Sequence, residues 1–247
     1  MPYNMKKLVE ACGSVELVIP VYNEERILVS QLRPVLEWSP KGMTVTVVQN
    51  GSTDSTSSIL NDLSAEFSCL KVMNLSEPGY GKAVKTGLDA SSGDVLMVDD
   101  LDVLDTEFWH QGLALIGLGK ADVVQGSKIL AGKNDRRPVV RRMASRVLTS
   151  LLKLLLGFRG TDTHGPKIMV REKVSEILPL CGDEPDLYPS ELIIRIQRKG
   201  LRIIELPVSL EEIRETPLAL YKRVPRAIRD LFRLRKKLGS RQMIPYR

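Results

Sequence analysis

The sequence predicts an α/β fold in which helices cover both faces of a mostly parallel sheet. Three observations support this prediction. Short apolar runs alternate with stretches of helical spacing along the first half of the 247-residue chain, as expected for strands joined by crossover helices. Several of these runs lead directly into polar loops, which is typical of the carboxyl ends of parallel strands. The composition, 43% hydrophobic and 27% charged, is that of a globular protein.

Five short apolar runs in the first half each predict a buried strand. They are residues 15–20, 44–49, 69–75, 94–99 and 121–128. The segments between them have helical spacing and predict helices, which are residues 23–38, 52–67, 81–93 and 105–116. Ser52, Asp54 and Asp105 stand where a side chain can cap a helix by accepting backbone N–H groups. Right-handed crossovers between these strands give a mostly parallel sheet.

The second half of the chain is less regular. Basic and apolar residues alternate over 136–158, and a glycine-rich turn leads into a strand within 160–170. A helix is predicted at 186–200, and one or two strands at 201–210. A basic amphipathic helix is predicted at 223–238. Its apolar stripe consists of Val224, Ala227, Ile228, Leu231, Leu234 and Leu238.

The net charge of +6 is concentrated at the C-terminal end. From Arg214 onwards, eleven Lys or Arg residues face two acids, so residues 1–213 carry −3. Three scattered cysteines and two histidines argue against a disulfide framework and a zinc site, and they suit a reducing compartment. The first 14 residues lack the apolar core of a signal peptide, and no segment has the ~20 apolar residues of a membrane span. We therefore expect a soluble or peripheral protein.

Four aspartates follow the predicted strand that ends near residue 98, namely Asp99, Asp100, Asp102 and Asp105. Like charges at this spacing repel, and a buried charge without a partner is costly. Either water screens all four carboxylates or a cation binds beside them. Without a bound cation, the repulsion should raise the pKa of carboxylates in the group. We expect Asp105 to cap the next helix and Asp99 to be turned away from a bound metal.

Two common nucleotide-binding motifs are missing from the loops. The pattern GxxxxGK[ST] fails at Gly81-Lys82, because Ser76 occupies the first glycine position and Ala83 follows the lysine. The dinucleotide pattern GxGxxG should follow the first strand, where the chain reads PVYNEE without glycine. The sequence therefore disfavours a P-loop kinase and a nicotinamide-dependent dehydrogenase.

Several motifs are weak alone but specific in their order and spacing. They are VIPVYNEE, NGSTDST, GYGKAVKTGL, DLD, GSK, DTHG and SELIIRIQRKGLRIIELPV, and they run from about Val15 to Arg223. In these motifs the chain resembles family 2 glycosyltransferases of the GT-A fold, most closely the polyprenyl-phosphate sugar transferases such as the dolichyl-phosphate mannose synthases. The resemblance implies a nucleotide-sugar donor, inversion at the sugar carbon, and a divalent metal, Mg²⁺ or Mn²⁺, held by a DxD motif.

The resemblance also implies roles by position. Asp100 and Asp102, on either side of Leu101, match the metal-binding pair. The catalytic positions are Asp102, Lys128 (where the family usually has arginine) and Glu191. The positions that match nucleotide-sugar contacts are Pro20, Tyr22, Glu24, Val48, Asn50, Lys82, Asp100, Leu101 and Arg214. Solvated surface charge is the alternative for Lys82, Lys128 and Arg214. A structural role is the alternative to a sugar or acceptor pocket for Asp162 and His164.

Three departures from the family pattern stand out. Gln49-Asn50 replaces the usual pair of aspartates, which leaves the base of the donor open. Residues 103–108, VLDTEF, replace the polar and proline residues that commonly follow DxD, so the outer metal sphere is expected to differ. Leu220 occupies the lysine position of an Arg-x5-Lys signature, and Lys222 and Arg223 are the nearest basic residues.

The chemistry of the acceptor decides whether a general base is needed. A hydroxyl must lose its proton as it attacks, and Asp186 and Glu191 are the carboxylates considered for that role. A lipid phosphate, with a second pKa of about 6, is already largely ionised at neutral pH and needs positioning and charge neutralisation instead. The basic tail and the arginines before the apolar helix suit a surface bound to anionic head groups. These arginines are Arg136, Arg137, Arg141 and Arg142.

We therefore predict a metal-dependent, inverting transferase that moves a hexose from a donor of the GDP-mannose or UDP-glucose type to a polyprenyl phosphate. It is expected to be peripheral on the cytoplasmic face of an anionic membrane. The expected domain covers 1–213, with a donor-binding half at about 15–130 and an acceptor half at about 131–213, followed by the basic tail at 214–247.

Three alternatives to this prediction stay open. The first is a transferase that acts on a hydroxyl of a soluble molecule or glycan. The second is a catalytically silent protein that only binds nucleotide, since Gln49-Asn50 departs from the pattern. The third, a nucleic-acid-binding module, is disfavoured because only 5% of the residues are aromatic and none interleave with a basic face.

Overall fold

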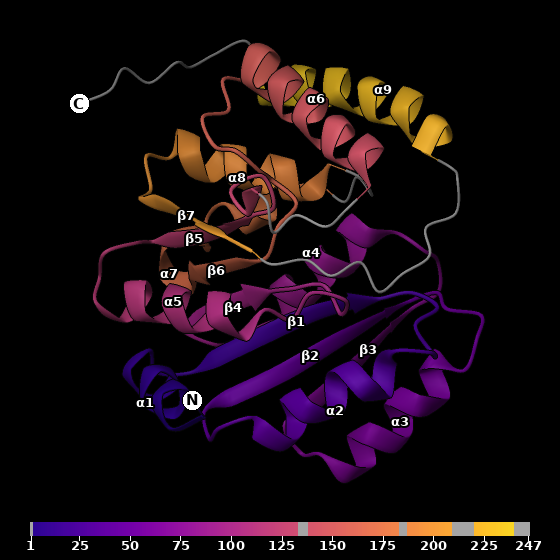
Figure 1. The fold of residues 1–247 in the computed structure, drawn as a ribbon, viewed down its shortest axis with the longest axis vertical. Helices are drawn as coiled ribbons and strands as arrows, with labels where there is room; N and C mark the ends of the chain where they lie inside the picture. The colour runs from indigo at the N-terminus through magenta and orange to yellow at the C-terminus, as the bar shows by residue number, and fades with distance from the viewer. Residues whose placement is uncertain (1, 133–137, 183–186, 209–219, 240–247) are drawn as a thin grey trace.

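The structure is a computed structural model that describes residues 2–132, 138–182, 187–208 and 220–239 (Figure 1). Its centre is a seven-stranded sheet with the order β3-β2-β1-β4-β6-β5-β7. The strands are β1 (Val15–Val21), β2 (Met43–Asn50), β3 (Leu70–Leu75), β4 (Val95–Val98), β5 (Val123–Ser127), β6 (Lys167–Val170) and β7 (Ile203–Pro207). The helices are α1 (Pro2–Ala11), α2 (Leu28–Trp38), α3 (Thr56–Glu66), α4 (Tyr80–Ala90), α5 (Thr106–Gly117), α6 (Val139–Leu156), α7 (Arg171–Val174), α8 (Tyr188–Arg198) and α9 (Leu220–Leu238), with a 3₁₀ turn η2 (Leu178–Leu180).

The sheet is mostly parallel, as predicted. β1 pairs in parallel with β2 and β4, β2 with β3, and β5 with β7. β6 runs antiparallel to both of its neighbours, β4 and β5. The carboxyl ends of the six parallel strands therefore lie along one edge, while β6 begins at that edge.

Helices cover both faces of the sheet and form two cores. In β1, Leu17 and Ile19 belong to the core that α1, α2, α3 and α5 cover, whereas Val18 belongs to the core under α4, α6, α8 and α9. All seven residues of β1 are buried, as expected for a central parallel strand. In Figure 1, α6 and α9 are the outermost helices on their side, and α8 lies between them and the sheet. The predicted α/β fold class is confirmed.

Element boundaries differ from the prediction at three places. α2 begins at Leu28 rather than near residue 23, because Asn23 adopts a left-handed conformation (φ +54) and bonds to the loop after β2. α3 begins at Thr56, whose backbone N–H donates to Asp54 Oδ1 at 3.0 Å. α1 was not predicted, and it buries Met5 and Val9 against the sheet core.

Among the described residues, no helix combines the length and the apolar character that crossing a bilayer requires. Cys12, Cys69 and Cys181 are free thiols.

Candidate active site

The loops after β1 and β2 are joined by hydrogen bonds at the carboxyl edge of the sheet. The backbone N–H of Asn23 donates to Ser52 Oγ at 3.0 Å, and that of Thr53 donates to Asn23 Oδ1 at 2.8 Å. Glu24 is buried, and its backbone N–H donates to Thr56 Oγ1 at 2.8 Å. The loops after β1 and β2 therefore lie together, as predicted. Hydrogen bonds from backbone N–H groups to side-chain oxygens fix their shape.

Gln49 and Asn50 fix the next loop. Gln49 Nε2 donates to Ser57 Oγ at 2.7 Å, while its Oε1 accepts from the backbone N–H of Gly51. Asn50 Oδ1 accepts from the backbone N–H of Gly79 at 2.7 Å, just before α4 begins. Gly51 has φ +69, and a Cβ there would lie 2.9 Å from the backbone of Glu77. Asn50 thus joins the loops after β2 and β3, while Gln49 fixes the loop after β2.

The acidic corner, which we define as Asp99, Asp100 and Asp102, begins where β4 ends. Asp99 is only 1% exposed, and its carboxylate accepts from Trp109 Nε1 at 2.7 Å and from the backbone N–H of Asp100 at 2.8 Å. Burial and the nearby charge of Asp100 raise the pKa of Asp99 well above its ordinary value. A carboxylate pKa is therefore raised, as expected, but burial rather than repulsion is the larger cause at Asp99.

The two DxD aspartates are half-buried, whereas Leu101 between them lies in the core. Tyr80, the first residue of α4, donates its hydroxyl to Asp100 Oδ1 at 2.9 Å. Burial and the charge of Asp100 raise the pKa of Tyr80 well above its ordinary value, so the hydroxyl keeps its proton and remains a donor. Tyr80 was not predicted as a site residue, although the motif GYGKAVKTGL contains it.

The loop that follows the acidic corner is strained. Leu104 has φ +38, a conformation that is uncommon for residues other than glycine. Directly after it, Asp105 caps α5 by accepting from the backbone N–H groups of Glu107 and Phe108, both at 3.0 Å. The predicted cap is therefore confirmed. Strain of this kind persists where the surroundings impose it, often at functional sites.

The acidic corner fits a divalent metal that shares its ligands with a diphosphate. Mg²⁺ and related hard cations favour oxygen ligands, and they are often held by one or two carboxylates together with phosphate oxygens. Asp100 and Asp102 supply such carboxylates. Within the part of the chain that the structure describes, no group of three or more His, Cys, Asp or Glu residues could hold a metal ion by itself.

The motif DTHG forms a loop that is tied to the exit of β5. Asp162 is buried and accepts from the backbone N–H groups of Lys128 at 3.0 Å and His164 at 2.8 Å. Thr163 Oγ1 lies 2.9 Å from His164 Nδ1 and 2.8 Å from Ser190 Oγ of α8. Lys128, Asp162 and His164 are therefore neighbours, in a structure that connects β5, β6 and α8.

Lys167, the first residue of β6, was not predicted as a site residue. Its side chain is almost completely buried, and its Nζ donates to the carbonyl oxygens of Thr163 and Gly165, both at 2.9 Å. Burial lowers its pKa to about 8, although the negative charges of Asp162, Asp100 and Asp99 act to raise it. No feature of a lone lysine in the sequence predicts that it will be buried. Only its position next to DTHG connects it with the motifs.

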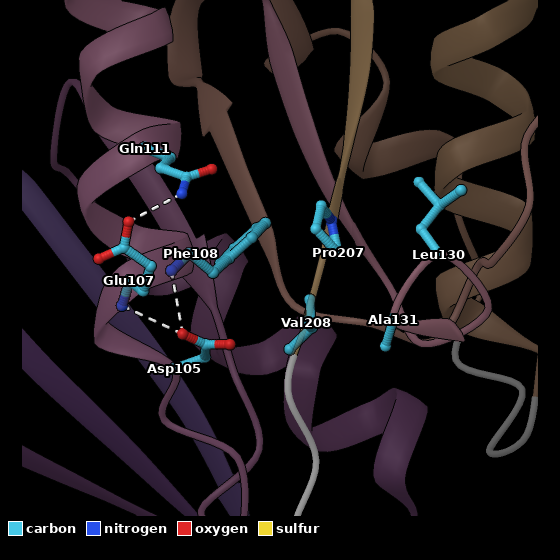
Figure 2. Close-up of a pocket in the computed structure, with 8 residues that line it drawn as sticks. All are labelled: Asp105, Glu107, Phe108, Gln111, Leu130, Ala131, Pro207 and Val208. Carbon is cyan, nitrogen blue, oxygen red and sulfur yellow. Dashed lines mark hydrogen bonds between the residues drawn. The ribbon is translucent and has the colours of Figure 1, made fainter. Parts of the chain in front are cut away.

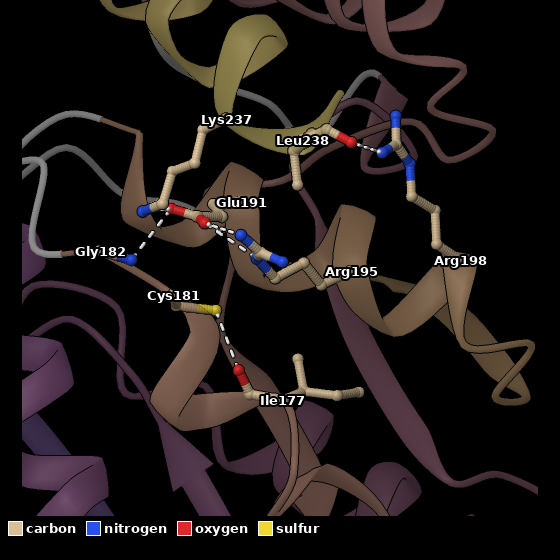
Figure 3. Close-up of polar contacts among 8 residues, drawn as sticks. All are labelled: Ile177, Cys181, Gly182, Glu191, Arg195, Arg198, Lys237 and Leu238. Carbon is tan, nitrogen blue, oxygen red and sulfur yellow. Dashed lines mark hydrogen bonds and ion pairs between the residues drawn. The ribbon is translucent and has the colours of Figure 1, made fainter. Parts of the chain in front are cut away.

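Glu191 lies where α8 meets α9 (Figure 3). It is 1% exposed, and its carboxylate accepts from Arg195 Nε at 2.8 Å, from Lys237 Nζ at 3.0 Å and from the backbone N–H of Gly182 at 3.0 Å. Arg198 donates to the carbonyl oxygen of Leu238 nearby. None of the described hydrogen bonds and ion pairs of Glu191 involves the acidic corner or Lys128. The structure thus places Glu191 in a junction between helices.

The remaining nucleotide-sugar positions lie on or beside the first strands. Pro20 and Val48 are buried neighbours in the register of β1 and β2. Tyr22 is 44% exposed just after β1, and Lys82 is half-buried in the first turn of α4. Arg214 and Asp186 lie outside the described residues, as do Arg136 and Arg137.

A family model described as glycosyl transferase family 2 matches residues 16–178. This range covers β1 to β6 and includes both DxD aspartates, and it is more than half of the chain. The chain belongs to glycosyl transferase family 2. It is therefore an enzyme of the glycosyltransferase class, as the motifs predicted.

Relatives of this transferase occur in archaea and bacteria. It is 27% identical over 216 residues to glycosyltransferase AglD of Haloferax volcanii, which covers 84% of this chain and 35% of AglD. It is 30% identical over 201 residues to an uncharacterized glycosyltransferase of Mycobacterium bovis, with 81% of this chain and 86% of that protein covered. It is 29% identical over 198 residues to the dolichyl-phosphate hexose transferase of Haloferax volcanii, with coverages of 79% and 82%.

Two solved structures show that this family 2 transferase has a GT-A fold. One is glucosyl-3-phosphoglycerate synthase from Mycobacterium tuberculosis in complex with UDP, with TM-score 0.65, 19% identity, and coverage of 96% of this chain and 84% of that chain. The other is the mannosyltransferase PcManGT from Pyrobaculum calidifontis in complex with GDP-Man and Mn²⁺, with TM-score 0.62, 17% identity, and coverages of 98% and 73%. At these identities the likeness concerns the fold alone.

The transferase also has a pocket of about 290 Å³, which includes Asp105 from the loop that follows the acidic corner (Figure 2). One wall comes from Asp105 and the N-terminal part of α5, and the other from the end of β7 and the segment that follows β5. The lining residues are Asp105, Glu107, Phe108, Gln111, Leu130, Ala131, Pro207 and Val208. Gln111 Nε2 donates to Glu107 Oε1 at 2.8 Å. Asp105 belongs both to the loop after DxD and to this pocket, which connects the two.

Proposed function

We propose that this family 2 transferase moves a hexose, with inversion, from a GDP-mannose or UDP-glucose type donor to a polyprenyl phosphate. The acidic corner carries this proposal, because Asp100 and Asp102 lie half-buried at the carboxyl edge of the sheet, where ligands of open α/β sheets bind. A bound Mg²⁺ or Mn²⁺ would supply Lewis-acid stabilisation of the charge that develops on the leaving diphosphate.

The residues of the chain would orient the donor. Tyr80 fixes Asp100 by its hydroxyl hydrogen bond, and the buried Leu101 anchors the backbone between the two aspartates. Pro20, Val48 and Asn50 lie on the adjoining strands β1 and β2, beside which we propose the nucleoside binds, together with Tyr22, Glu24 and Lys82. We propose that Lys128, whose backbone is fixed to Asp162, neutralises phosphate charge, assisted by Arg214.

The acceptor proposal rests on the surface formed by α6 and α9, which we call the α6–α9 face. The two helices contact each other and are the outermost elements on their side (Figure 1). The face exposes large apolar side chains, which are Val139, Val140, Met143, Val147, Leu154 and Phe232. Arg146, Lys153 and Arg233 are exposed on the same two helices. Exposed apolar residues beside basic ones suit a surface that rests on an anionic membrane.

Two further points support a lipid phosphate. A phosphate acceptor is already largely ionised at neutral pH, so no base is required, and the carboxylate of Glu191 is engaged by Arg195 and Lys237. A relative that is 29% identical is named dolichyl-phosphate hexose transferase. On this proposal the donor half lies at about 15–130 and the acceptor half at about 131–213, with residues 214–247 as a basic tail on the cytoplasmic face of the membrane.

A soluble acceptor is the second proposal, and the pocket that includes Asp105 favours it. Asp105, Glu107 and Gln111 offer carboxylate and amide groups, which form hydrogen bonds with hydroxyls. A structural neighbour is named glucosyl-3-phosphoglycerate synthase. For such an acceptor, Glu191 or Asp186 would have to act as the base.

Product partitioning separates the two proposals. The protein is incubated with radiolabelled UDP-glucose or GDP-mannose, Mn²⁺ and a polyprenyl phosphate in detergent micelles, and the products are extracted with organic solvent. We expect label in the organic phase only when the polyprenyl phosphate is present. Transfer only to a water-soluble acceptor such as phosphoglycerate would contradict the lipid proposal and support the second one.

A further inference from the structure

Lys167 is a buried cation next to the acidic corner. It lies at the start of β6, between β4 and β5, in register with Val98 on one side and Gln125 on the other. Val98 is the residue directly before Asp99, so the lysine and the acidic corner start from adjacent strand positions. Lys167 is 3% exposed, which is rare for a lysine that is not paired.

The ammonium group of Lys167 holds the DTHG loop in place. It donates two hydrogen bonds, to the carbonyl oxygens of Thr163 and Gly165. The loop packs closely against the backbone of β5, because a Cβ at Gly165 would lie 2.0 Å from the carbonyl oxygen of Gly126. Gln125 Nε2 also donates to the carbonyl of Gly165, at 3.2 Å. The position of the ammonium is therefore fixed by the same contacts that fix the loop.

The charges that surround Lys167 are mainly negative. Asp162, Asp100 and Asp99 all favour its charged form, while burial and Lys128 oppose it. With its pKa lowered to about 8, the group stays mostly protonated at neutral pH. At neutral pH the acidic corner thus has an internal cation nearby, which offsets part of the repulsion among its carboxylates.

We propose that Lys167 is a positioning residue that holds the DTHG loop and, by its charge, weakens the binding of a divalent metal to the acidic corner in the absence of nucleotide. A second cation beside an internal one is repelled, whereas the diphosphate of a nucleotide adds the negative charge that offsets both. Metal and nucleotide would therefore bind cooperatively. This inference rests on the proposed function, since it takes Asp100 and Asp102 as the metal-binding pair.

Calorimetric titration of the full chain with Mn²⁺ tests the proposal, first with Mn²⁺ alone and then with UDP or GDP present. In Lys167→Met we expect Mn²⁺ alone to bind on the order of tenfold more tightly than in the wild type, which corresponds to about 1.4 kcal/mol. The gain in Mn²⁺ affinity that the nucleotide produces should shrink by a similar factor. Lys167→Arg, which keeps the charge, should remain within about twofold of the wild type. Lys199→Met is the matched control, because Lys199 is exposed and pairs with Glu176.

Unchanged or weaker binding of Mn²⁺ alone by folded Lys167→Met would overturn the proposal. If that variant does not fold, Lys167→Gln, which keeps N–H donors for the two carbonyls, carries the same comparison. If neither neutral variant folds, recovery of the folded state at saturating Mn²⁺ supports the proposal, and no recovery contradicts it. If the wild type itself binds no Mn²⁺ even with UDP or GDP present, the metal site of the proposed function fails, and this inference fails with it.

Discussion

Two of the buried carboxylates of this transferase, Glu191 and Asp99, have opposite surroundings. At the α8–α9 junction, Glu191 has two cationic partners, Arg195 and Lys237, at hydrogen-bond distance. At the acidic corner, the donors to Asp99 among the described residues are uncharged, namely Trp109 and the backbone of Asp100, and the pKa of Asp99 is raised. A buried acid with full ion pairing joins elements of the fold, whereas an acidic group with incomplete compensation is suited to receive a cation.

Replacing Asp102 is expected to give the largest effect. If Asp102 holds the metal, Asp102→Asn removes one of its ligands. The Lewis-acid contribution of the metal is several kcal/mol, so turnover should fall by roughly a thousandfold or more. The melting temperature should stay the same or rise, since the substitution removes like-charge repulsion. Steady-state transfer assays and thermal unfolding measure the two effects. Asp62→Asn, which removes an exposed acid on α3, is the control and should keep nearly full activity.

Replacing Glu191 should have the opposite result, a loss of stability with little loss of turnover. Glu191→Gln leaves Arg195 and Lys237 facing a neutral group, so the free energy of unfolding should fall by about 2–4 kcal/mol, as for other broken buried pairs. Turnover per folded molecule should change by less than about tenfold, because a lipid phosphate needs no base. Glu176→Gln is the control for an exposed pair, with an expected change below about 0.5 kcal/mol. A thousandfold loss of turnover at unchanged stability would show instead that Glu191 is the catalytic base.

Glu191 joins α8 to α9 through Lys237, and α9 is part of the α6–α9 face. A third experiment tests whether this face contacts a membrane. Leu154 on α6 is 81% exposed, so Leu154→Glu should leave the fold intact but weaken binding to anionic vesicles by about tenfold, the loss expected for one buried leucine. Leu118, at the end of α5, is 69% exposed and belongs to the opposite face of the sheet. Leu118→Glu is therefore the matched control. Vesicle sedimentation that is equal for both variants and the wild type would contradict a lipid-facing role for the α6–α9 face.

The smallest expected effect lies at the far end of the sheet. Asp122 accepts three hydrogen bonds from Arg202, which hold the pKa of this carboxyl below its usual range. Because the folded-state pKa is lowered, its stabilising contribution is present above the ordinary Asp pKa and is lost as the pH falls through the lowered one. Asp122→Asn should cost about 1–2 kcal/mol at pH 7 and less in acid, with turnover unchanged. Urea unfolding of the wild type and the variant at pH 7 and in acid measures this difference. An equal loss of unfolding free energy under both conditions would contradict the lowered pKa of Asp122.

The sequence predicts the strands and the loops after them because both leave local signals. A buried parallel strand is a continuous apolar run, and a loop at its carboxyl end is polar, as at Val98 and Asp99. The direction of β6 leaves no such signal, since KIMV reads the same in a parallel and an antiparallel strand. α2 is shorter than its helical spacing predicts, because contacts of residues 23–25 with a loop 30 residues away override the local pattern.

Candidate site residues that belong to a recognisable motif could be predicted from the sequence, whereas residues that join the site only because they are buried beside it could not. Asp100, Asp102 and the cap at Asp105 follow from their positions after β4. Tyr80 and Lys167 were missed, because a tyrosine or lysine is recognised as part of a site only when tertiary contacts bury it beside the acids. The ion pairs of Glu191 come from residues 4 and 46 positions away, and the more distant partner leaves no signal in the sequence.

Calorimetry of nucleotide-sugar binding tests the central claim most directly. UDP-glucose and GDP-mannose are titrated into the wild-type chain with Mn²⁺, with Mg²⁺ and with a chelator. If Asp100 and Asp102 share a divalent cation with the diphosphate, at least one donor should bind at least about tenfold more tightly with metal than with chelator, and Asp102→Asn should abolish the difference. Equal affinity for both donors with and without metal would contradict the account.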